Sequence, residues 1–296
     1  MVVSNVSYKL HNKTEKLEAY TKYTGKFTPS NITEPVKRCH QLIKNFIINK
    51  YSNNINTLVD IGTGRGHDVK AWNNANIKTI IGLEPSESSY LSALSKLKSN
   101  NIIYLRAIGN KLWCNGDAAL DDKAKEELPK IKDADRIHMF WTIHYCIDTK
   151  QDFRNLYNNI NNTLTSNNKL IILLMNGELI HKLLNKYNGI IKVVFQGEII
   201  FYIKAYYDYA SKSLSPYGNK IGVFLLGTYG LNTEIIENIV SIKFLCNYFN
   251  KHSYNTELSQ NFIKFSKINN ITCMHNLINH QKIISLFYNI LIFNKK

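Results

Sequence analysis

The sequence predicts an α/β fold with a mostly parallel central sheet and helices on both of its faces. Short apolar runs alternate with longer amphipathic runs over roughly the first 185 residues, which is the pattern of strand–helix–strand units. The first apolar run ends in a glycine-rich turn that passes into a helix, as in proteins that bind a ligand at a strand end. Hydrophobic residues make up 44% of the chain and charged residues 20%, so the chain can bury a full core.

The first predicted element is a basic amphipathic helix. Apolar residues recur at helical spacing between Val36 and Ile47, and the turn-rich segment 52–56 ends the pattern. The residues before this helix are polar, with scattered aromatic side chains and no sustained period. We therefore divide the chain into an N-terminal arm, residues 1–35, and one domain, residues 36–296.

Alternating strands and helices follow this first helix. Strands are predicted at residues 57–61, 79–83, 102–107, 136–143 and 169–175, and helices at residues 68–74, 86–97 and 153–164. Because each strand is separated from the next by a helix or a long connection, the strands are expected to run parallel.

The C-terminal part of the chain has a different pattern of predicted elements. It is β-rich at residues 190–195, 198–206 and 220–226, helical at 233–250, and apolar at 282–293, while 253–280 is interpreted as a helix or an insertion. No internal repeat and no linker rich in proline and glycine divides the chain. We therefore expect one domain whose sheet continues into a β-rich C-terminal extension.

The charge of the chain favours a polyanionic partner. Lysine and arginine number 37 against 22 acidic residues, which gives a net charge of +15. Nucleic acid is the leading partner class, because no lipidation motif or basic amphipathic membrane helix is evident. The alternative is that the lysines reflect only an Asn-, Ile- and Lys-rich composition, which is typical of AT-rich genomes.

The cysteine pattern and the hydropathy of the chain indicate in which cellular compartment the protein is expected. The five cysteines include no CxxC pair, so neither a disulfide framework nor a zinc site is predicted, which suits a reducing environment. No long apolar stretch or apolar N-terminal run is present, so we expect a soluble, unsecreted protein without membrane contact.

The glycine-rich turn is the most specific pattern in the chain. Asp60 is followed by Gly62, Gly64 and Gly66, and a helix begins directly afterwards. Glycines permit positive φ and let a ligand approach bare backbone, and a helix N-terminus favours negative charge. A dinucleotide-binding turn would place its third glycine at position 67, which is His67 here.

This spacing resembles motif I of the S-adenosylmethionine-dependent methyltransferases, whose class I fold is Rossmann-like. The resemblance implies S-adenosylmethionine as cofactor, with Glu84 at the next strand end accepting hydrogen bonds from the ribose hydroxyls. It also implies that Asp117, after the third strand, binds the adenine amino group. The alternative is a glycine turn without a ligand, with Glu84 as a solvated carboxylate.

Further motifs resemble the mRNA cap (guanine-N7) methyltransferase family, especially the divergent members from large DNA viruses. In chain order they are residues 38–48 (RCHQLIKNFII), 64–72 (GRGHDVKAW), 140–145 (FWTIHY), 217–223 (YGNKIGV), 237–240 (ENIV) and 286–295 (LFYNILIFNK). The resemblance runs from about Val36 to the C-terminus. The chain departs from the family pattern at Phe140 (usually Gln), Ala71 (Lys), Gly222 (Asp) and Asn238-Ile239 (Tyr-Leu).

The resemblance assigns roles to several residues of the cofactor site. Lys44 is expected to pair with the carboxylate of the methionine moiety, and Asp60 and Gly62 to line the same end. Asp68 either hydrogen-bonds the glycine turn or complements the dipole of the following helix. The alternative for Lys44 is an ordinary solvated lysine.

The resemblance also assigns a guanine site, with cap-binding elements mainly at 140–145 and 200–296. His144 and Tyr145 are expected to lie against the guanine, and Glu237 to accept hydrogen bonds from its N1 and N2 hydrogens. The alternatives are residues at the edge of the core and a solvated glutamate.

Other residues are assigned less specifically. Tyr20, Tyr23 and Phe27 either fold over the cap or, as we favour, cover the core. The basic residues Lys37, Arg38, Arg65, Lys70 and Lys111 either contact the triphosphate bridge and RNA backbone or belong only to the surface.

The implied function is therefore transfer of a methyl group from S-adenosylmethionine to N7 of the terminal guanosine of GpppN-capped RNA. The implied partners are capped RNA and a stimulatory or capping-complex subunit, in the host cytoplasm if the protein is viral, with packaging into virions as a further option. Two alternatives remain: a methyltransferase for another RNA or a small molecule, and a non-catalytic, RNA-binding subunit of a capping complex.

Overall fold

The computed structural model describes residues 33–97, 101–195, 197–227 and 233–296. Most of the predicted N-terminal arm, including Tyr20, Tyr23 and Phe27, lies outside the described residues. The prediction that these aromatic side chains cover the core or the cap is therefore not tested by the fold.

A seven-stranded sheet forms the centre of the molecule, in the order β10-β11-β5-β4-β1-β2-β3. Its strands are β1 (Thr57–Ile61), β2 (Thr79–Leu83), β3 (Ile102–Leu105), β4 (Ala134–Phe140), β5 (Leu164–Met175), β10 (Tyr254–Asn261) and β11 (Tyr288–Lys295). Strands β1 to β5 pair in parallel, β11 pairs antiparallel with β5, and β10 pairs antiparallel with β11. The predicted α/β class with a mostly parallel sheet is confirmed.

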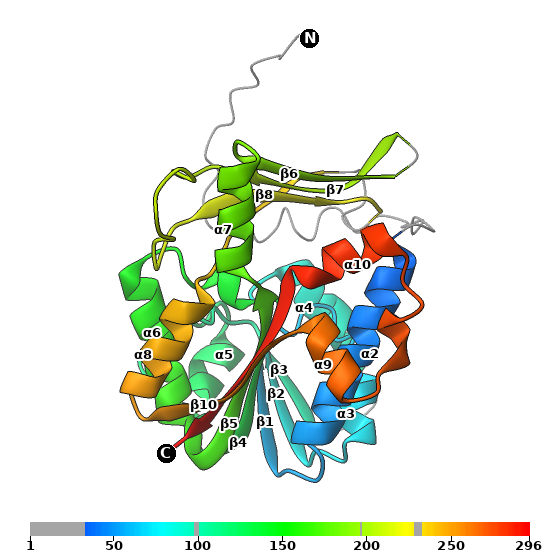
Figure 1. Cartoon of the computed structure of the whole chain (residues 1–296). Helices are drawn as coiled ribbons and strands as arrows, with labels where there is room; N and C mark the ends of the chain where they lie inside the picture. Colours follow the sequence, from blue (N-terminus) through cyan, green and yellow to red (C-terminus); the bar gives the residue numbers. More distant parts are fainter. Residues whose placement is uncertain (1–32, 98–100, 196, 228–232) are drawn as a thin grey trace.

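Helices cover both faces of this sheet (Figure 1). They are α2 (Glu34–Tyr51), α3 (Val69–Asn74), α4 (Glu87–Leu94), α5 (Asp122–Glu127), α6 (Lys150–Thr163), α7 (Gly177–Lys186), α8 (Ile242–Lys251), α9 (Phe262–Ile268) and α10 (Asn279–Leu286). Side chains alternate across β1, so that Leu58 joins the core under α2, α3 and α9, while Val59 joins the core under α6 and α8. This alternation explains why β1 is apolar at consecutive positions.

A second, four-stranded antiparallel sheet stands at one end of the main sheet (Figure 1). It contains β6 (Ile190–Phe195), β7 (Glu198–Ala205), β8 (Lys220–Leu225) and β9 (Ile235–Asn238). The expectation of one continued sheet therefore holds for β11 but is wrong for residues 190–238. The helix or insertion expected at 253–280 is also partly wrong, because Tyr254–Asn261 forms strand β10 beside β11 and a helix, α9, begins only at Phe262. Helix α7 packs on the second sheet through a core that contains Ile180, Leu184 and Phe201.

The helix predicted for residues 233–250 is also wrong in its first half. Ile235 and its neighbours pair with β8 as strand β9, and the helix starts only at Ile242. Ser241 marks the start, because its hydroxyl accepts a hydrogen bond from the backbone N–H of Phe244. The β-branched pair Ile235-Ile236 favours a strand locally.

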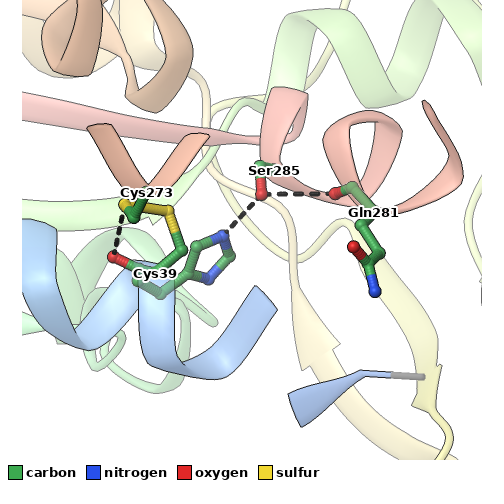
Figure 2. Close-up of a disulfide and its surroundings, with 5 residues drawn as sticks. Cys39, Cys273, Gln281 and Ser285 are labelled. Atoms are coloured by element: carbon green, nitrogen blue, oxygen red, sulfur yellow. Dashed lines mark hydrogen bonds between the residues drawn. A yellow bond between two sulfur atoms is a disulfide. The ribbon is translucent and has the colours of Figure 1, made fainter. Parts of the chain in front are cut away.

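A disulfide joins two distant parts of the chain, contrary to the expectation that the cysteines form none. Cys39 of α2 is bonded to Cys273, with 5.3 Å between their Cα atoms (Figure 2). Beside it, His40 Nε2 lies 3.0 Å from the hydroxyl of Ser285. The two cysteines are 234 positions apart, so spacing gives no signal; the fold brings them together by packing the C-terminal helices on α2.

Reducing this disulfide is expected to lower stability without unfolding the protein. A cross-link that closes a long loop typically stabilises a fold by about 2–4 kcal/mol. For a chain of this size, that corresponds to a melting temperature about 4–10 °C lower in dithiothreitol. Cys273→Ser should reproduce this drop and abolish the effect of the reductant, whereas Cys114→Ser, at an exposed free cysteine, should change neither.

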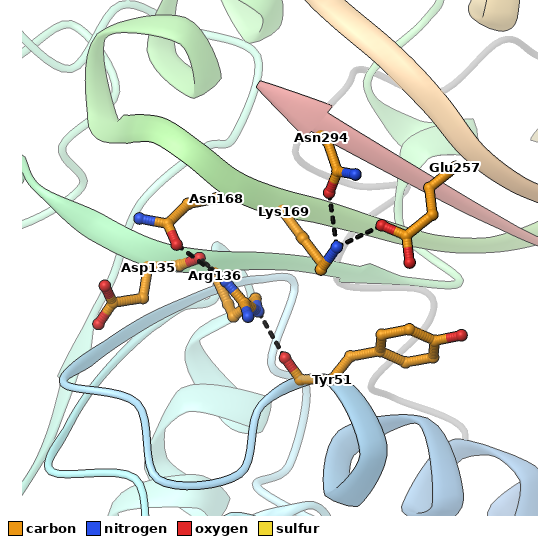
Figure 3. A network of polar contacts seen from close by, with 7 residues as sticks. All are labelled: Tyr51, Asp135, Arg136, Asn168, Lys169, Glu257 and Asn294. Atoms are coloured by element: carbon orange, nitrogen blue, oxygen red, sulfur yellow. Dashed lines mark hydrogen bonds and ion pairs between the residues drawn. The ribbon is translucent and has the colours of Figure 1, made fainter. Parts of the chain in front are cut away.

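Polar contacts join neighbouring strands at the end of the main sheet where β4 begins (Figure 3). Arg136 donates to the backbone carbonyl of Tyr51 at 2.5 Å and to the side chain of Asn168 at 3.0 Å. Lys169 of β5 contacts Glu257 of β10 and donates to Asn294 of β11 at 2.6 Å. These contacts join β4, β5, β10, β11 and the end of α2 to one another. The carboxyl ends of the parallel strands lie at the opposite end of the sheet.

Candidate functional site

A cavity of about 890 Å³ opens at the carboxyl ends of β1, β2 and β4. Such a position, beyond the carboxyl ends of parallel strands, is where open α/β sheets bind ligands. Most of the residues that the sequence singled out line it: Lys44, Asp60, Gly62, Gly64, Asp68, Glu84, His144, Tyr145 and Glu237. The fold therefore brings the predicted cofactor site and the predicted guanine site into one cavity.

The three glycines of the turn have different roles. All have positive φ, at 83°, 58° and 67° for Gly62, Gly64 and Gly66. A Cβ on Gly62 would lie 2.3 Å from the hydroxyl of Thr142, whereas a Cβ on Gly64 would meet no atom within 4 Å. Gly64 thus leaves backbone open to the cavity. Gly66 does not line this cavity, because it packs against Tyr104.

Glu84 fastens the glycine turn from the end of β2. Its carboxylate accepts hydrogen bonds from the backbone N–H of Gly64 at 2.8 Å and of Ser86 at 2.9 Å. Burial raises the pKa of Glu84 to about 7, although these two hydrogen bonds oppose the shift. A buried carboxylate that faces a cavity is a strong acceptor for neutral donors such as hydroxyl groups.

Asp60 is the most buried carboxyl group of the cavity. Burial, followed by the negative charge of Asp68, raises the pKa of Asp60 to about 8. A positively charged ligand beside Asp60 would favour its ionised form. Asp60 and Glu84 together place two buried carboxyl groups on the side of the cavity next to the glycine turn.

Lys44 and Asp68 form a buried ion pair, which was not predicted for Asp68. No hydrogen bond from the described glycine turn to Asp68 is seen, while its position at the N-cap of α3 agrees with the predicted complement to the helix dipole. The ammonium of Lys44 lies 2.6 Å from Asp68 and 5.1 Å from the centre of the Trp141 ring. Asp68 makes no capping hydrogen bond to α3. An ammonium group has three donors, so the pair fixes Lys44 and leaves capacity for a second anion.

Trp141 is a feature of the cavity that sequence reasoning missed. It is a non-glycine residue with φ of 54°, directly after β4, and it lines the cavity beside Lys44. Positive φ in a bulky residue is costly and is concentrated at functional sites. The motif around it was recognised in the sequence, but backbone strain leaves no signal in residue type.

His144, Tyr145 and Glu237 come together from distant segments. His144 Nε2 lies 3.1 Å from the carboxylate of Glu237, and the rings of His144 and Tyr145 lie 4.1 Å apart. Burial raises the pKa of Glu237 and lowers that of His144. Glu237 belongs to β9, so the second sheet supplies this side of the cavity. The neighbouring Asn238 holds the segment by donating to the backbone carbonyl of His144 at 3.0 Å.

Asp117 is not brought into the cavity, which contradicts its predicted position. Its carboxylate is exposed and accepts a hydrogen bond from Asn115 at 2.7 Å, within a tight turn. Asn110 lies in the cavity instead, and its side-chain nitrogen is buried with no hydrogen-bond partner among the described residues. An orphaned buried donor facing a cavity suits a ligand with an acceptor nitrogen or oxygen. The position of Asn110 shortly after β3 is the sequence signal that could have identified it.

The basic residues separate into two groups. Lys37, Arg38, Arg65 and Lys111 line the cavity around its buried carboxylates, and they are more exposed than those carboxylates. Lys70 does not line the cavity. Within the described ranges, no cluster of three metal-binding side chains occurs, and no helix is both long and apolar enough to span a membrane.

The buried carboxyl groups predict that the protein loses stability in alkaline solution. Asp60, Glu84 and Glu237 have raised pKa values in the folded protein, so the folded state binds more protons than the unfolded state between about pH 4.5 and 8. Their stabilising effect is lost as the pH rises through 7 to 8. The opposite holds for His40 and His138, whose pKa values are lowered to about 3 by burial, so their effect is lost as the pH falls below 6.5.

The melting temperature should therefore be highest near pH 6.5 and fall between pH 6.5 and 8.5. Scanning fluorimetry in matched buffers measures it. Glu237→Gln removes one of the three carboxyl groups and should reduce the alkaline fall. A melting temperature that rises from pH 6.5 to 8.5 would contradict the assignment of raised pKa values.

Solved structures with similar folds are S-adenosylmethionine-dependent methyltransferases or resemble them. The CcbJ methyltransferase from Streptomyces caelestis matches with a TM-score of 0.54 and 10% identity, over 96% of this chain and 99% of that chain. A putative S-adenosylmethionine-dependent methyltransferase from Listeria monocytogenes matches with a TM-score of 0.53 and 11% identity, over 88% and 98%. At such low identity these matches establish the fold, which is the predicted Rossmann-like methyltransferase fold.

Sequence relatives are more specific. The mRNA cap guanine-N(7) methyltransferase of Saccharomyces cerevisiae is 24% identical over 215 residues, which cover 69% of this chain and 46% of that protein. The probable mRNA-capping enzyme of Acanthamoeba polyphaga mimivirus is 29% identical over 168 residues, 50% of this chain and 14% of that protein. The chain thus spans about half the length of the yeast relative and a small part of the viral one.

A family model covers nearly the whole chain. The mRNA (guanine-N(7))-methyltransferase domain matches residues 11–283, which include α2, the glycine turn, the His144 segment and β9. The match includes strands of both sheets, ends before β11, and confirms the family resemblance derived from the motifs. The chain belongs to the mRNA (guanine-N7) methyltransferase family.

Proposed function

We propose that this protein transfers a methyl group from S-adenosylmethionine to N7 of the terminal guanosine of capped RNA. The observation that carries the proposal is the single cavity in which the buried carboxylate of Glu237 faces the same space as the glycine turn and Glu84. Family membership supports the same reaction. The reaction requires one acceptor for the guanine edge and one for the ribose. The carboxylates of Glu237 and Glu84 would provide them.

The residues of the cavity fit S-adenosylmethionine. Its nucleoside would be bound by the open backbone at Gly64, the acceptor Glu84 and the unpartnered donor of Asn110. Lys44 would pair with its carboxylate. Asp60, whose pKa is raised by burial, would be shifted toward its ionised form by a sulfonium beside it. When bound, this cofactor supplies an electrophilic methyl group.

Guanine recognition would rest on Glu237. The Watson–Crick edge of guanine presents two adjacent donors, N1–H and the N2 amino group, which a carboxylate accepts in bidentate fashion. His144 and Tyr145 offer ring faces beside it, and stacking favours a base that gains positive charge on methylation. Adenine would leave the buried carboxylate unpaired, which gives specificity.

No general base is required of the protein. Guanine N7 has an available lone pair and carries no proton, so the residues act by positioning. Lys44 and Glu84 would hold one reactant and Glu237 the other, in one cavity. Groups that are held in place before the reaction need little reorganisation during it.

The proposed partners follow from the reaction. Capped RNA is the substrate, and a stimulatory or capping-complex subunit is a further proposed partner, in the host cytoplasm. The mimivirus relative is described as a probable mRNA-capping enzyme, which supports this setting.

A methyl transfer assay tests the proposal. The protein is incubated with labelled S-adenosylmethionine and GpppA-capped RNA, GTP or uncapped RNA, and the product is digested to locate the methyl group. We expect label on N7 of the terminal guanosine with capped RNA and none with uncapped RNA. Methylation of internal nucleotides would favour another RNA methyltransferase, and binding of S-adenosylhomocysteine without transfer would favour a non-catalytic subunit.

A further inference from the structure

A second hollow lies on the outer side of the glycine turn. It is a groove of about 440 Å³ between the start of α3 and the segment after α4. Its seven lining residues are Gly66, His67, Val69, Lys70, Asn73, Asn74 and Lys96. The sequence alone makes Lys70 either an RNA-backbone contact or a surface residue, and Gly66 belongs to the predicted glycine turn; the other residues of the groove are assigned no ligand.

The groove carries positive charge with no compensating carboxylate in its lining. Lys70 and Lys96 are cationic, and Asn73 and Asn74 add side-chain amides that can donate hydrogen bonds. The nearest acidic side chain along the chain, Asp68, is already paired with Lys44. The groove thus offers cations and neutral donors together, which is the chemistry that binds phosphodiesters.

One of these cations is held in place. The ammonium of Lys96 donates to the backbone carbonyl of Arg65 at 2.6 Å, which fixes the lysine across the glycine turn. Burial and the charge of Arg65 lower the pKa of Lys96. Burial, then Lys96 and Lys44, lower the pKa of His67. Burial is the larger cause of both shifts, and the neighbouring cations add to them, a part that an anion would relieve.

The groove adjoins the cavity. His67 lines both, and Arg65 lines the cavity while its carbonyl holds Lys96 of the groove. A chain that leaves the cavity past Arg65 and His67 would therefore pass beside the groove. A small molecule confined to the cavity would not reach Lys70.

We propose that this groove binds the phosphodiester backbone of the single-stranded RNA that follows the cap. The inference rests on the proposed function for the identity of the substrate in the cavity. Lys70 and Lys96 would each neutralise a phosphate, and Asn73 and Asn74 would donate to phosphate or sugar oxygens. The groove would then contribute affinity for RNA without selecting its sequence.

The test compares a capped RNA of about 20 nucleotides with the dinucleotide GpppA, using Lys70→Gln/Lys96→Gln and Lys70→Gln alone. We expect the double variant to raise KM for capped RNA by about 10-fold and leave KM for GpppA within about 2-fold. Binding of a dye-labelled uncapped 20-nucleotide RNA, followed by fluorescence anisotropy, should weaken in parallel. Its dependence on salt should also fall, by about 0.7 in logarithmic slope for each phosphate that is no longer neutralised.

A matched control removes the same charge elsewhere. Lys243→Gln/Lys251→Gln changes two exposed lysines of α8, which packs on the opposite face of the main sheet from α3, and should leave all these values unchanged. Equal losses on capped RNA and GpppA, or RNA binding that falls equally in the control, would overturn the proposal. If the unmodified protein methylates neither substrate, the proposed function fails, while the anisotropy measurement still decides whether the groove binds RNA.

Discussion

Replacing Glu237 with alanine is expected to lower kcat/KM for capped RNA by about 30- to 900-fold, with binding of S-adenosylhomocysteine changed by no more than about 2-fold. Removing one side of a buried, charge-assisted hydrogen-bond pair costs about 2–4 kcal/mol. Glu237 is buried, and it lies on β9, in a different sheet from the glycine turn, so its loss should not disturb the cofactor end. Steady-state kinetics and isothermal titration measure the two quantities.

Two further variants separate the effect of guanine recognition by Glu237 from the effect of its side-chain packing. Glu237→Gln keeps the shape but presents an amide that can accept only through its single oxygen, so it should retain stability and still lose most activity. Glu234→Ala, three positions earlier and outside the cavity lining, should behave as the unmodified protein. Equal loss of capped-RNA turnover and cofactor binding in Glu237→Ala would contradict the assignment of this residue to guanine.

Most of the parallel sheet could be predicted because its signals are local. Apolar runs such as residues 57–61 and 79–83 became β1 and β2 with unchanged bounds. The helix on residues 233–241 was predicted wrongly because β9 forms only against β8, a contact that periodicity does not encode. The Cys39–Cys273 bond has the same origin, since it depends on the packing of C-terminal helices on α2.

The candidate site could be predicted where residue type and position both carry information. A glycine turn and an acidic strand end specify Gly64 and Glu84 by chemistry, and the structure brings them into hydrogen-bond contact. Asp117 was selected by type alone, and the turn after β3 directs it to solvent. Asn110 was missed because an asparagine in a loop has many roles, and its orphaned nitrogen is visible only in three dimensions.

Replacing Glu84 with alanine is expected to weaken binding of S-adenosylhomocysteine by at least about 100-fold while the fold is retained. The carboxylate would accept two hydrogen bonds from a ribose, and hydrogen bonds to a charged group contribute about 1.5–3 kcal/mol each. The variant also leaves the backbone N–H groups of Gly64 and Ser86 without their acceptor, so the melting temperature should fall as well. Isothermal titration and scanning fluorimetry follow the two effects.

The two effects of Glu84→Ala can be separated by Glu84→Gln, whose side-chain oxygen can still accept from the turn. This variant should recover most of the melting temperature but little of the affinity, because one neutral oxygen cannot serve both the turn and the ribose. Glu87→Ala provides the control, since Glu87 is an exposed carboxylate three residues later whose partner is Arg106 at 3.4 Å. Cofactor affinity that stays within about 2-fold in both Glu84 variants would remove Glu84 from the site. The glycine turn would then need another acceptor for the ribose, and no second carboxylate among the described residues accepts from Gly64.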